Sequence, residues 1–331
     1  MTERTLEDVL GHPPPGDAEG ETRVAVLAEL ADLAKVLSAL VRRSALEGLL
    51  GAAGRVNATG DSVKALDLRA NEIVVERLVA SRLLAGIVSE ELEELKPVSC
   101  EPMARHILAI DPVDGSSNVA VNGPLGTIFG LYRRRSTQTC GMLEAELVGG
   151  QADLVAAGYV LYGPATMLVV AGGDDVRGFT LDEESGRWRL SHPALRIPED
   201  GPTLAANLGR QAGWSDATRA FVDEELLREG SPKSQRYLGA LVADVHRCLI
   251  EGGVYLYPAE RAHPDGKLRQ LYECAPMAFI AERAGGAGTD GRGRILERTV
   301  RTMHDRSPIA VGSRAPVERY QATVGGASSR P

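Results

Sequence analysis

The sequence predicts an α/β protein in which helices pack against β-sheets in layers around a large apolar core. Amphipathic helical segments alternate along the chain with short apolar runs of strand length, and glycine and proline bound many of these runs. The chain has 331 residues, 44% of them hydrophobic, which is enough for one large domain or two closely packed ones. These observations favour a compact enzyme.

Helices and strands alternate in the first half of the chain. Apolar residues recur every three or four positions over residues 24–41 and predict an amphipathic helix, and a second helix is expected over 63–79. The proline-rich residues 11–21 before them are predicted to form a non-helical arm. Strands are expected at 107–110 and 126–132 and in two apolar runs within 158–171, which Gly163 and Pro164 separate. A hairpin is expected over 179–190.

A polar, proline-rich passage near residues 191–202 divides the chain. Within it we place the boundary between an N-terminal subdomain, residues 1–195, and a C-terminal subdomain, residues 196–331. The elements expected beyond the boundary are helices at 216–228, 237–250 and 269–283 and strands at 254–258 and 309–311.

The charge pattern argues against two broad classes of protein. The net charge is -8 and the pI is about 5.4, and no Lys- or Arg-rich run alternates with aromatic residues, so no nucleic-acid-binding surface is expected. The first residues lack the basic and apolar regions of a secretory signal, and no run of about 18 apolar residues could cross a membrane. We therefore expect a cytoplasmic protein with no membrane partner.

The cysteines are spaced too irregularly to predict a metal site or a disulfide framework. Cys100, Cys140, Cys248 and Cys274 include no CxxC pair. We expect them to be buried or incidental thiols.

The chemistry is predicted where an apolar strand ends, in the segment Asp-Pro-Val-Asp-Gly-Ser-Ser-Asn at 111–118. Asp111 and Asp114 lie three residues apart where proline and glycine bend the chain, so they and the Val113 carbonyl can converge on one hard cation. The glycine and serines that follow offer amides and hydroxyls of the kind that bind phosphate. The same string also suits an ordinary surface turn. The phosphate-binding candidates are Gly115, Ser116 and Ser117.

Two further pairs of carboxylates lie next to apolar segments. Asp61 and Asp67 fall at the start of the second predicted helix, where an aspartate also serves as an ordinary helix cap. Glu90 and Glu91 close an apolar run, and they equally begin a solvated acidic stretch. Neither pair identifies a site by itself.

Glu273 lies in a segment that is expected to be largely buried. A buried carboxylate without a partner is costly, so a metal ion is implied, or an ordinary ion pair with Lys267 or Arg269. Together these residues form an all-oxygen set that suits Mg²⁺ or Mn²⁺. Two or more such ions can clamp a phosphoryl group and activate water, which predicts phosphate-ester hydrolysis. The set comprises Asp61, Asp67, Glu90, Glu91, Asp111, Asp114 and Glu273.

These motifs, taken in order, resemble class I fructose-1,6-bisphosphatase of the bacterial, Calvin-cycle type. The resemblance covers about residues 24–320. A lone Asp-Pro-x-Asp-Gly would indicate only the wider superfamily of metal-dependent sugar phosphatases, whereas Lys-Leu-Arg-x-Leu-Tyr-Glu-Cys at 267–274 is far narrower. The segments that carry the resemblance are 57–61, 89–91, 111–118, 126–129, 236–237, 243–246, 257–259 and 266–274.

The resemblance implies a layered αβαβα sandwich, a homotetramer, and a phosphoric monoester hydrolase of carbohydrate metabolism. Its implied reaction is Mg²⁺-dependent release of the 1-phosphate of D-fructose 1,6-bisphosphate, giving fructose 6-phosphate in gluconeogenesis or the Calvin cycle. Two or more ions per subunit are implied, with Mn²⁺ as an alternative. The implied metal ligands are Glu90, Asp111, the Val113 carbonyl, Asp114 and Glu273. The implied catalytic residues are Glu91 as general base and Asp67 and Asp61 beside it.

The resemblance also implies how the substrate is held. The 1-phosphate would contact Asp114, Gly115, Ser116, Ser117 and Arg269. Lys267 would reach the sugar and the distal phosphate. The 6-phosphate would be held by Asn207, Tyr237 and Tyr257, with Arg236 entering from a neighbouring subunit.

Two departures from the family pattern bear on specificity and regulation. The family has Glu-Gly-Tyr where this chain has Leu208, Gly209 and Arg210. This difference predicts a wider or more basic pocket for the distal phosphate. The alternative function is therefore a bifunctional enzyme that also accepts sedoheptulose 1,7-bisphosphate. The AMP site of animal members is only partly matched. Arg105 and His106 stand in place of a Lys-Tyr pair, although Arg133 remains at the position of a phosphate-binding arginine. Weak or no AMP inhibition is expected.

Two more distant alternatives remain. An inositol-type phosphatase would share the carboxylate set but lack the segment at 267–274. A non-catalytic sugar-phosphate sensor on the same fold would be expected to lose metal carboxylates, and none of the expected ones is missing.

Overall fold

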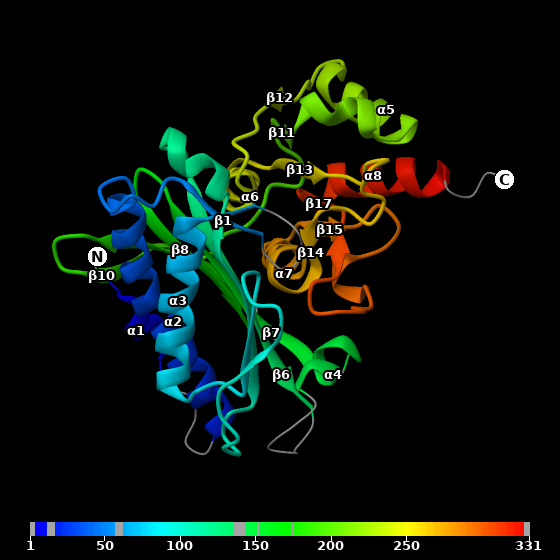
Figure 1. Cartoon of the computed structure of the whole chain (residues 1–331). Helices are drawn as coiled ribbons and strands as arrows, with labels where there is room; N and C mark the ends of the chain where they lie inside the picture. The colour runs from blue at the N-terminus through cyan, green and yellow to red at the C-terminus, as the bar shows by residue number, and fades with distance from the viewer. Residues whose placement is uncertain are drawn as a thin grey trace.

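The computed structural model describes residues 4–11, 17–56, 62–135, 143–150, 152–173 and 175–327. Within these residues the chain forms two large mixed β-sheets and three layers of helices (Figure 1). The first sheet has eight strands in the order β10-β9-β8-β7-β6-β5-β3-β4. The strands are β3 Gly86–Ser89, β4 Lys96–Pro97, β5 His106–Asp114, β6 Leu125–Arg134, β7 Ala152–Tyr162, β8 Thr166–Gly172, β9 Asp175–Asp182 and β10 Arg187–His192.

The second sheet has five strands in the order β12-β11-β13-β17-β15, and two small two-stranded sheets accompany it. The strands of the second sheet are β11 Thr203–Ala206, β12 Ser234–Gln235, β13 Gly253–Tyr257, β15 Ala287–Thr289 and β17 Ile309–Gly312. The small sheets pair β1 Ala52–Val56 with β2 Ser62–Lys64, and β14 Leu268–Arg269 with β16 Arg306–Ser307. The boundary predicted at 195/196 falls between the two large sheets.

Eight α-helices and four short helices complete the described part of the chain. The α-helices are α1 Leu6–Leu10, α2 Ala18–Arg43, α3 Ala65–Ser81, α4 Leu143–Val148, α5 Asp216–Leu227, α6 Leu241–Glu251, α7 Ala275–Arg283 and α8 Arg314–Ala327. The short helices are η1 Ser116–Val121, η2 Leu208–Gly213, η3 Gln270–Cys274 and η4 Ile295–Glu297.

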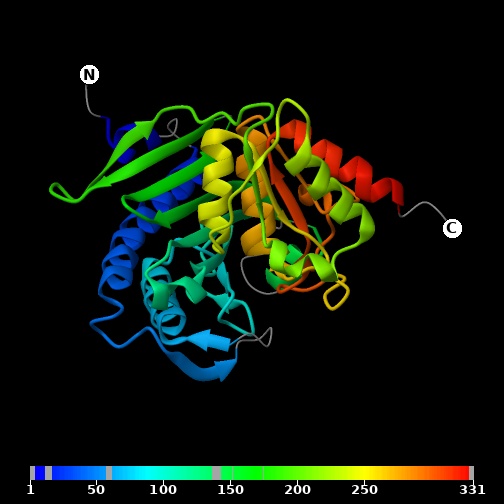
Figure 2. The same cartoon turned by 90° about the horizontal axis from the view of Figure 1, so that it is seen from above.

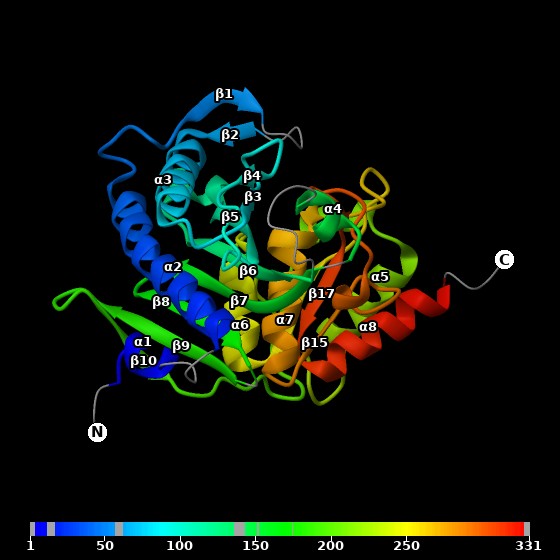
Figure 3. The ribbon, with the colours of Figure 1, turned by 90° about the horizontal axis from the view of Figure 1, so that it is seen from below.

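The layers follow from which side chains share a core. Leu33 of α2 and Val74 of α3 pack with Leu108 of β5, so these helices cover the outer face of the eight-stranded sheet. The cluster between the sheets joins α6 and α7 to both of them, and Figure 2 shows the two helices between the sheets. On the far side, Phe221 of α5 and Tyr320 of α8 meet edge to face at 5.2 Å and cover the five-stranded sheet (Figure 3). The fold is therefore the predicted αβαβα sandwich.

Three local expectations differ from the structure. The predicted arm over residues 11–21 is helical from Ala18 onward, because the Asp17 carboxylate accepts the Gly20 N–H at 2.9 Å and caps α2. The single helix predicted over 269–283 is divided into the π-helix η3 and α7, with proline in the first turn of α7 where a missing N–H costs least. Cys100 is disulfide-bonded rather than a thiol, whereas Cys248 and Cys274 are free and buried as expected.

None of the described helices is both long enough and apolar enough to cross a bilayer.

Candidate active site

A cavity of about 350 Å³ lies where the end of β5 meets the start of α6 and the five-stranded sheet. Glu90 follows β3, Asp111 and Asp114 end β5, and Glu273 comes from η3. Segments far apart in the sequence therefore converge on one space. The described residues around it are Glu90, Asp111, Val113, Asp114, Gly115, Ser116, Ser117, Asn207, Arg210, Tyr237, Gly239, Leu241, Tyr255, Tyr257, Leu268, Arg269 and Glu273.

The end of β5 has the geometry that the motif predicts. The pairing of β5 with β6 is irregular between Asp111 and Asp114, and the Val113 N–H donates to Asp111 Oδ1 at 3.0 Å. Gly115 follows with φ +78°, and a Cβ there would lie 2.5 Å from the Cβ of Ala240. Only glycine fits without displacing the start of α6, so the turn brings the serines of η1 to the cavity.

Asp114 joins the two halves of the molecule. Its carboxylate oxygens accept the backbone N–H groups of Leu241 and Val242 at 3.2 and 2.7 Å, at the N-terminus of α6. Burial raises the pKa of Asp114 to about 7, although these two amides act in the opposite direction. The helix N-terminus thus holds a carboxylate that the sequence predicts as a metal ligand.

The carboxylates are close enough to raise one another's pKa values. The pKa of Asp111 is raised well above its usual range by burial and then by the charges of Glu90 and Glu273. Burial raises the pKa of Glu273 to about 8, with Arg269 opposing the shift. Burial likewise raises the pKa of Asp67 to about 6, against hydrogen bonds from Lys64 and Ser116. Such a cluster of like charges favours binding of a proton or a cation.

Arg269 is the cation that faces this cluster. Its guanidinium lies 2.7 Å from Glu90 Oε1 and 3.8 Å from Glu273 Oε2, and its backbone N–H donates to Glu273 Oε2 at 2.6 Å. The ion-pair interpretation of Glu273 is therefore partly correct. The cavity is still lined by four carboxylates and only two arginines among the described residues.

The five-stranded sheet contributes a different wall. Asn207 follows β11, Arg210 lies on η2, and Tyr257 ends β13. Tyr237 bonds to the Asn207 side chain, and burial raises the pKa of Tyr237 to about 12. Arg210 pairs with Glu260 at 3.1 Å. This wall offers neutral hydrogen-bond donors and one cation.

Some of the predicted site residues do not line the cavity. Asp67 lies behind the turn, where its Oδ2 accepts the Lys64 N–H at 2.9 Å and its buried Oδ1 has no hydrogen-bond partner among the described residues. Glu91, Arg236 and Lys267 are not part of the lining. Asp61 lies outside the described residues.

Sequence reasoning missed the partners of several site residues. The amides that bind Asp114, the Arg269 contact to Glu90, and the pairing of Arg210 with Glu260 all join segments distant in sequence. No local pattern signals such contacts.

The donor set fits a hard divalent cation, although it is not arranged as a finished metal site. In the described part of the chain, no three His, Cys, Asp or Glu side chains are already grouped to hold a metal ion. Glu90 is engaged by Arg269 and Asp114 by two amides. The mutual repulsion at Asp111 and the unpartnered Oδ1 of Asp67 nevertheless leave oxygen donors in need of a cation.

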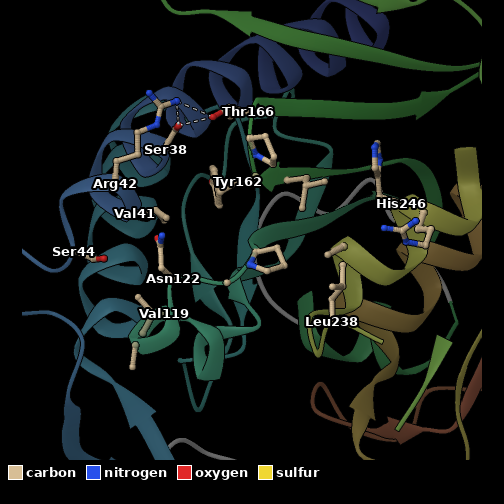
Figure 4. Close-up of a pocket in the computed structure, with 18 of the residues that line it drawn as sticks. Ser38, Val41, Arg42, Ser44, Val119, Asn122, Tyr162, Thr166, Leu238 and His246 are labelled. Carbon is tan, nitrogen blue, oxygen red and sulfur yellow. Dashed lines mark hydrogen bonds between the residues drawn. The ribbon is translucent and has the colours of Figure 1, made fainter. Parts of the chain in front are cut away.

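A larger cavity of about 910 Å³ lies elsewhere, between the end of α2, α6 and the turn after β7 (Figure 4). Arg42 donates to Ser38 Oγ and Thr166 Oγ1 at 3.1 and 3.0 Å along one side of it. His246 contacts Tyr159 through Nδ1 at 2.8 Å, and burial lowers its pKa to about 4. A packed neutral histidine and mainly apolar walls do not suit phosphate chemistry.

A five-layer α/β fold with clustered carboxylates beside a glycine-serine turn defines the class of metal-dependent sugar phosphatases. Two family models match nearly the whole chain: "Fructose-1-6-bisphosphatase, N-terminal domain" over residues 13–193 and "Fructose-1-6-bisphosphatase, C-terminal domain" over 197–325. The chain therefore belongs to the fructose-1,6-bisphosphatase family.

Individual relatives agree with this assignment. The chain is 47% identical over 297 residues to a class 1 fructose-1,6-bisphosphatase of Acaryochloris marina, covering 89% of each chain. It is 43% identical over 325 residues to the class 1 enzyme of Sorangium cellulosum, covering 97% of this chain and 92% of the other. Its structure matches holo fructose-1,6-bisphosphatase of Leishmania major with a TM-score of 0.90 at 33% identity, covering 97% and 99% of the two chains.

Proposed function

We propose that the protein hydrolyses the 1-phosphate of D-fructose 1,6-bisphosphate, giving fructose 6-phosphate and inorganic phosphate. The observation that supports this most directly is the convergence of Glu90, Asp111, Asp114 and Glu273 beside a Gly-Ser-Ser turn, in a chain of this family. A carboxylate cluster and a phosphate-binding turn together suit metal-assisted attack of water on a phosphate ester.

The family is metal-dependent, and we assign Mg²⁺, two or more ions per subunit, as the metal. The ligands would be Glu90, Asp111, the Val113 carbonyl, Asp114 and Glu273, all of which line the cavity. When bound, Mg²⁺ would lower the pKa of the attacking water and neutralise charge on the phosphate. Glu90 would have to turn from Arg269 to take part.

Proton transfer is assigned to three acidic residues. Glu91 is the proposed general base, and Asp67 and Asp61 are proposed to assist it. The pKa of Asp67, raised to about 6 by burial, supports this role, because a group that titrates near neutral pH can accept a proton and release it again. Ser116 links Asp67 to the phosphate-binding turn.

Substrate contacts are assigned to the two walls of the cavity. The amides and hydroxyls of residues 115–117 and the Arg269 guanidinium would hold the 1-phosphate. Asn207, Tyr237 and Tyr257 would hold the 6-phosphate, and all three line the opposite wall. Lys267 would reach the sugar from the edge of the site.

We also propose that the protein assembles as a homotetramer, with Arg236 completing a neighbouring active site. Arg236 is exposed, and large apolar side chains are exposed near the cavity of Figure 4: Val121 by 76%, Leu238 by 43% and Ile250 by 41%. Size-exclusion chromatography with light scattering measures the mass of the assembly. A monomer at micromolar protein concentration would contradict the proposed tetramer.

Phosphate release from fructose 1,6-bisphosphate, with and without Mg²⁺, tests the function. Release should need the metal, and inositol 1-phosphate should be a poor substrate. Glu91→Gln should lose at least about a hundredfold in kcat while still binding the bisphosphate, since general-base catalysis contributes about 10²–10⁴-fold. An unchanged rate in this variant would remove Glu91 from the mechanism, and no hydrolysis by the native protein would indicate a non-catalytic sugar-phosphate sensor.

A second substrate is supported by one specific residue. Arg210 lines the wall assigned to the distal phosphate and adds a permanent charge there. Sedoheptulose 1,7-bisphosphate is therefore proposed as an additional substrate. The ratio of the kcat/KM values for the two bisphosphates measures the preference of the enzyme between them.

A further inference from the structure

Among the described residues, one ion pair holds Arg210 at the active-site cavity. It lies on the short helix η2, directly after β11, and lines the same wall as Asn207 and Tyr257. Its Nη1 is 3.1 Å from Glu260 Oε2 and 3.5 Å from Oε1. No other polar partner of the Arg210 side chain occurs among the contacts of the described residues.

The two partners of this ion pair differ in exposure. The Arg210 side chain is 44% exposed, whereas that of Glu260 is 10% exposed. The backbone of Glu260 is fixed, because its N–H donates to the His263 carbonyl and its carbonyl accepts the His263 N–H. Arg210 is therefore the movable partner, and solvent screening keeps the pair weak.

The charges around the cavity make Arg210 important for an anionic substrate. Of the two arginines in the lining, Arg269 faces Glu90 and Glu273. The other donors on the distal wall, Asn207, Tyr237 and Tyr257, are neutral. Arg210 is thus the cation of the described lining that is not facing the acidic cluster, and a guanidinium can bind phosphate through two parallel N–H groups.

We propose that Arg210 exchanges the Glu260 carboxylate for the distal phosphate of the substrate, and so determines how strongly the enzyme selects sugars that carry this phosphate. The inference rests on the proposed function, because it names the residue that reads the second phosphate. Glu260 holds the guanidinium beside the pocket and competes with the distal phosphate for it. The dianionic phosphate displaces the Glu260 carboxylate, because the phosphate carries more negative charge and can accept two parallel N–H groups of the guanidinium.

Three variants test the exchange. Arg210→Gln should raise KM for fructose 1,6-bisphosphate and Ki for fructose 6-phosphate by about tenfold each, because one charge-assisted contact is lost. The kcat should stay within about twofold, since the reacting phosphate is at the other wall. Arg210→Lys should restore part of the affinity. Glu260→Gln should lower both constants by about threefold, since the competitor is neutralised at constant shape.

Arg261→Gln is the matched control. Arg261 lies next to Glu260 and donates to the Ala212 carbonyl of η2, but it does not line the cavity. Its replacement removes one guanidinium charge from the loop that contacts η2 and leaves a donor for that carbonyl. Both constants should stay within about twofold of the native values. An equal loss in this control would mean a general field effect and would overturn the exchange.

Two further results would refute the proposal. An unchanged Ki for fructose 6-phosphate in Arg210→Gln would show that the guanidinium does not contact the distal phosphate. A higher KM in Glu260→Gln would show that Glu260 supports binding rather than competing. Calorimetric titration with fructose 6-phosphate needs no turnover, so it tests Arg210 even if the protein fails to hydrolyse the bisphosphate. If the native protein showed no hydrolysis, this result would contradict the proposed function but not the role of Arg210 in binding the distal phosphate.

Discussion

Replacing Asp67 by asparagine should stabilise the metal-free protein at alkaline pH while reducing its activity. Asp67 is only 6% exposed, and burial raises its pKa from 3.8 to about 6. Each pKa unit corresponds to about 1.4 kcal/mol, so ionising this buried carboxylate costs about 3 kcal/mol of folding free energy. Asparagine carries no charge and keeps an oxygen for the Lys64 N–H.

The sign follows from proton binding. A carboxyl group whose pKa is higher in the folded than in the unfolded state binds more protons when folded, so stability falls as pH rises between 3.8 and about 6. The penalty is complete above this window. After about 1 kcal/mol is deducted for a poorer hydrogen bond, Asp67→Asn should gain about 2 kcal/mol at pH 8. Near pH 4 the ionisation penalty has largely gone and the deduction remains, so the variant should be slightly less stable than the native protein.

Urea unfolding in EDTA at the two pH values measures this difference. Asp200→Asn is a control of opposite sign. Burial alone would raise the pKa of Asp200, but hydrogen bonds from Lys233 and other groups outweigh it and hold the pKa at about 2. That variant should therefore lose stability at pH 8. If Asp67→Asn were also less stable than the native protein at pH 8, the cost assigned to the buried carboxylate would be incorrect.

Two other predictions concern regulation and the turn. AMP should not inhibit the enzyme at sub-millimolar concentration. Arg133, which the resemblance matches to a phosphate-binding arginine, already pairs with Glu19 at 3.3 Å and with Asp153 at 3.1 Å. An inhibition curve with half-effect below 1 mM AMP would contradict this prediction. Gly115→Ala should lower kcat/KM at least about tenfold and cost about 1–3 kcal/mol of stability, because φ is +78° and the new Cβ would meet Ala240 at 2.5 Å. Steady-state kinetics and thermal unfolding test it, and a variant with native values for both would show that the turn accepts a side chain.

Local sequence patterns predicted much of the fold. The buried run before Asp111 predicts a strand, and β5 extends from His106 to Asp114 with every residue buried. The hairpin of β9 and β10 is likewise as predicted. The prediction for the start of α2 was wrong, because the hydrogen bond by which Asp17 caps this helix lies in a segment whose prolines argue against a helix. Helix termini depend on single side-chain contacts, which periodicity does not contain.

The candidate site divides in the same way. The residue types and their order predict a carboxylate set and a phosphate-binding turn, because these depend on neighbours within a few positions. The placement of Glu273 depends on the π-helix η3, and the placement of the Arg210 guanidinium depends on its ion pair with Glu260. Neither follows from spacing along the chain.

By itself the sequence determined the chemistry available to this protein: oxygen ligands rather than thiols or imidazoles, a glycine turn for phosphate, and strands and helices that must form layers to bury their apolar faces. Only the tertiary structure decided which charges meet. Asp114 reaches amides 127 and 128 positions away, and Arg269 reaches Glu90, because packing α6 and α7 between two sheets closes these distances. Burial at that junction then shifts the pKa values, and burial is a property of the packed molecule.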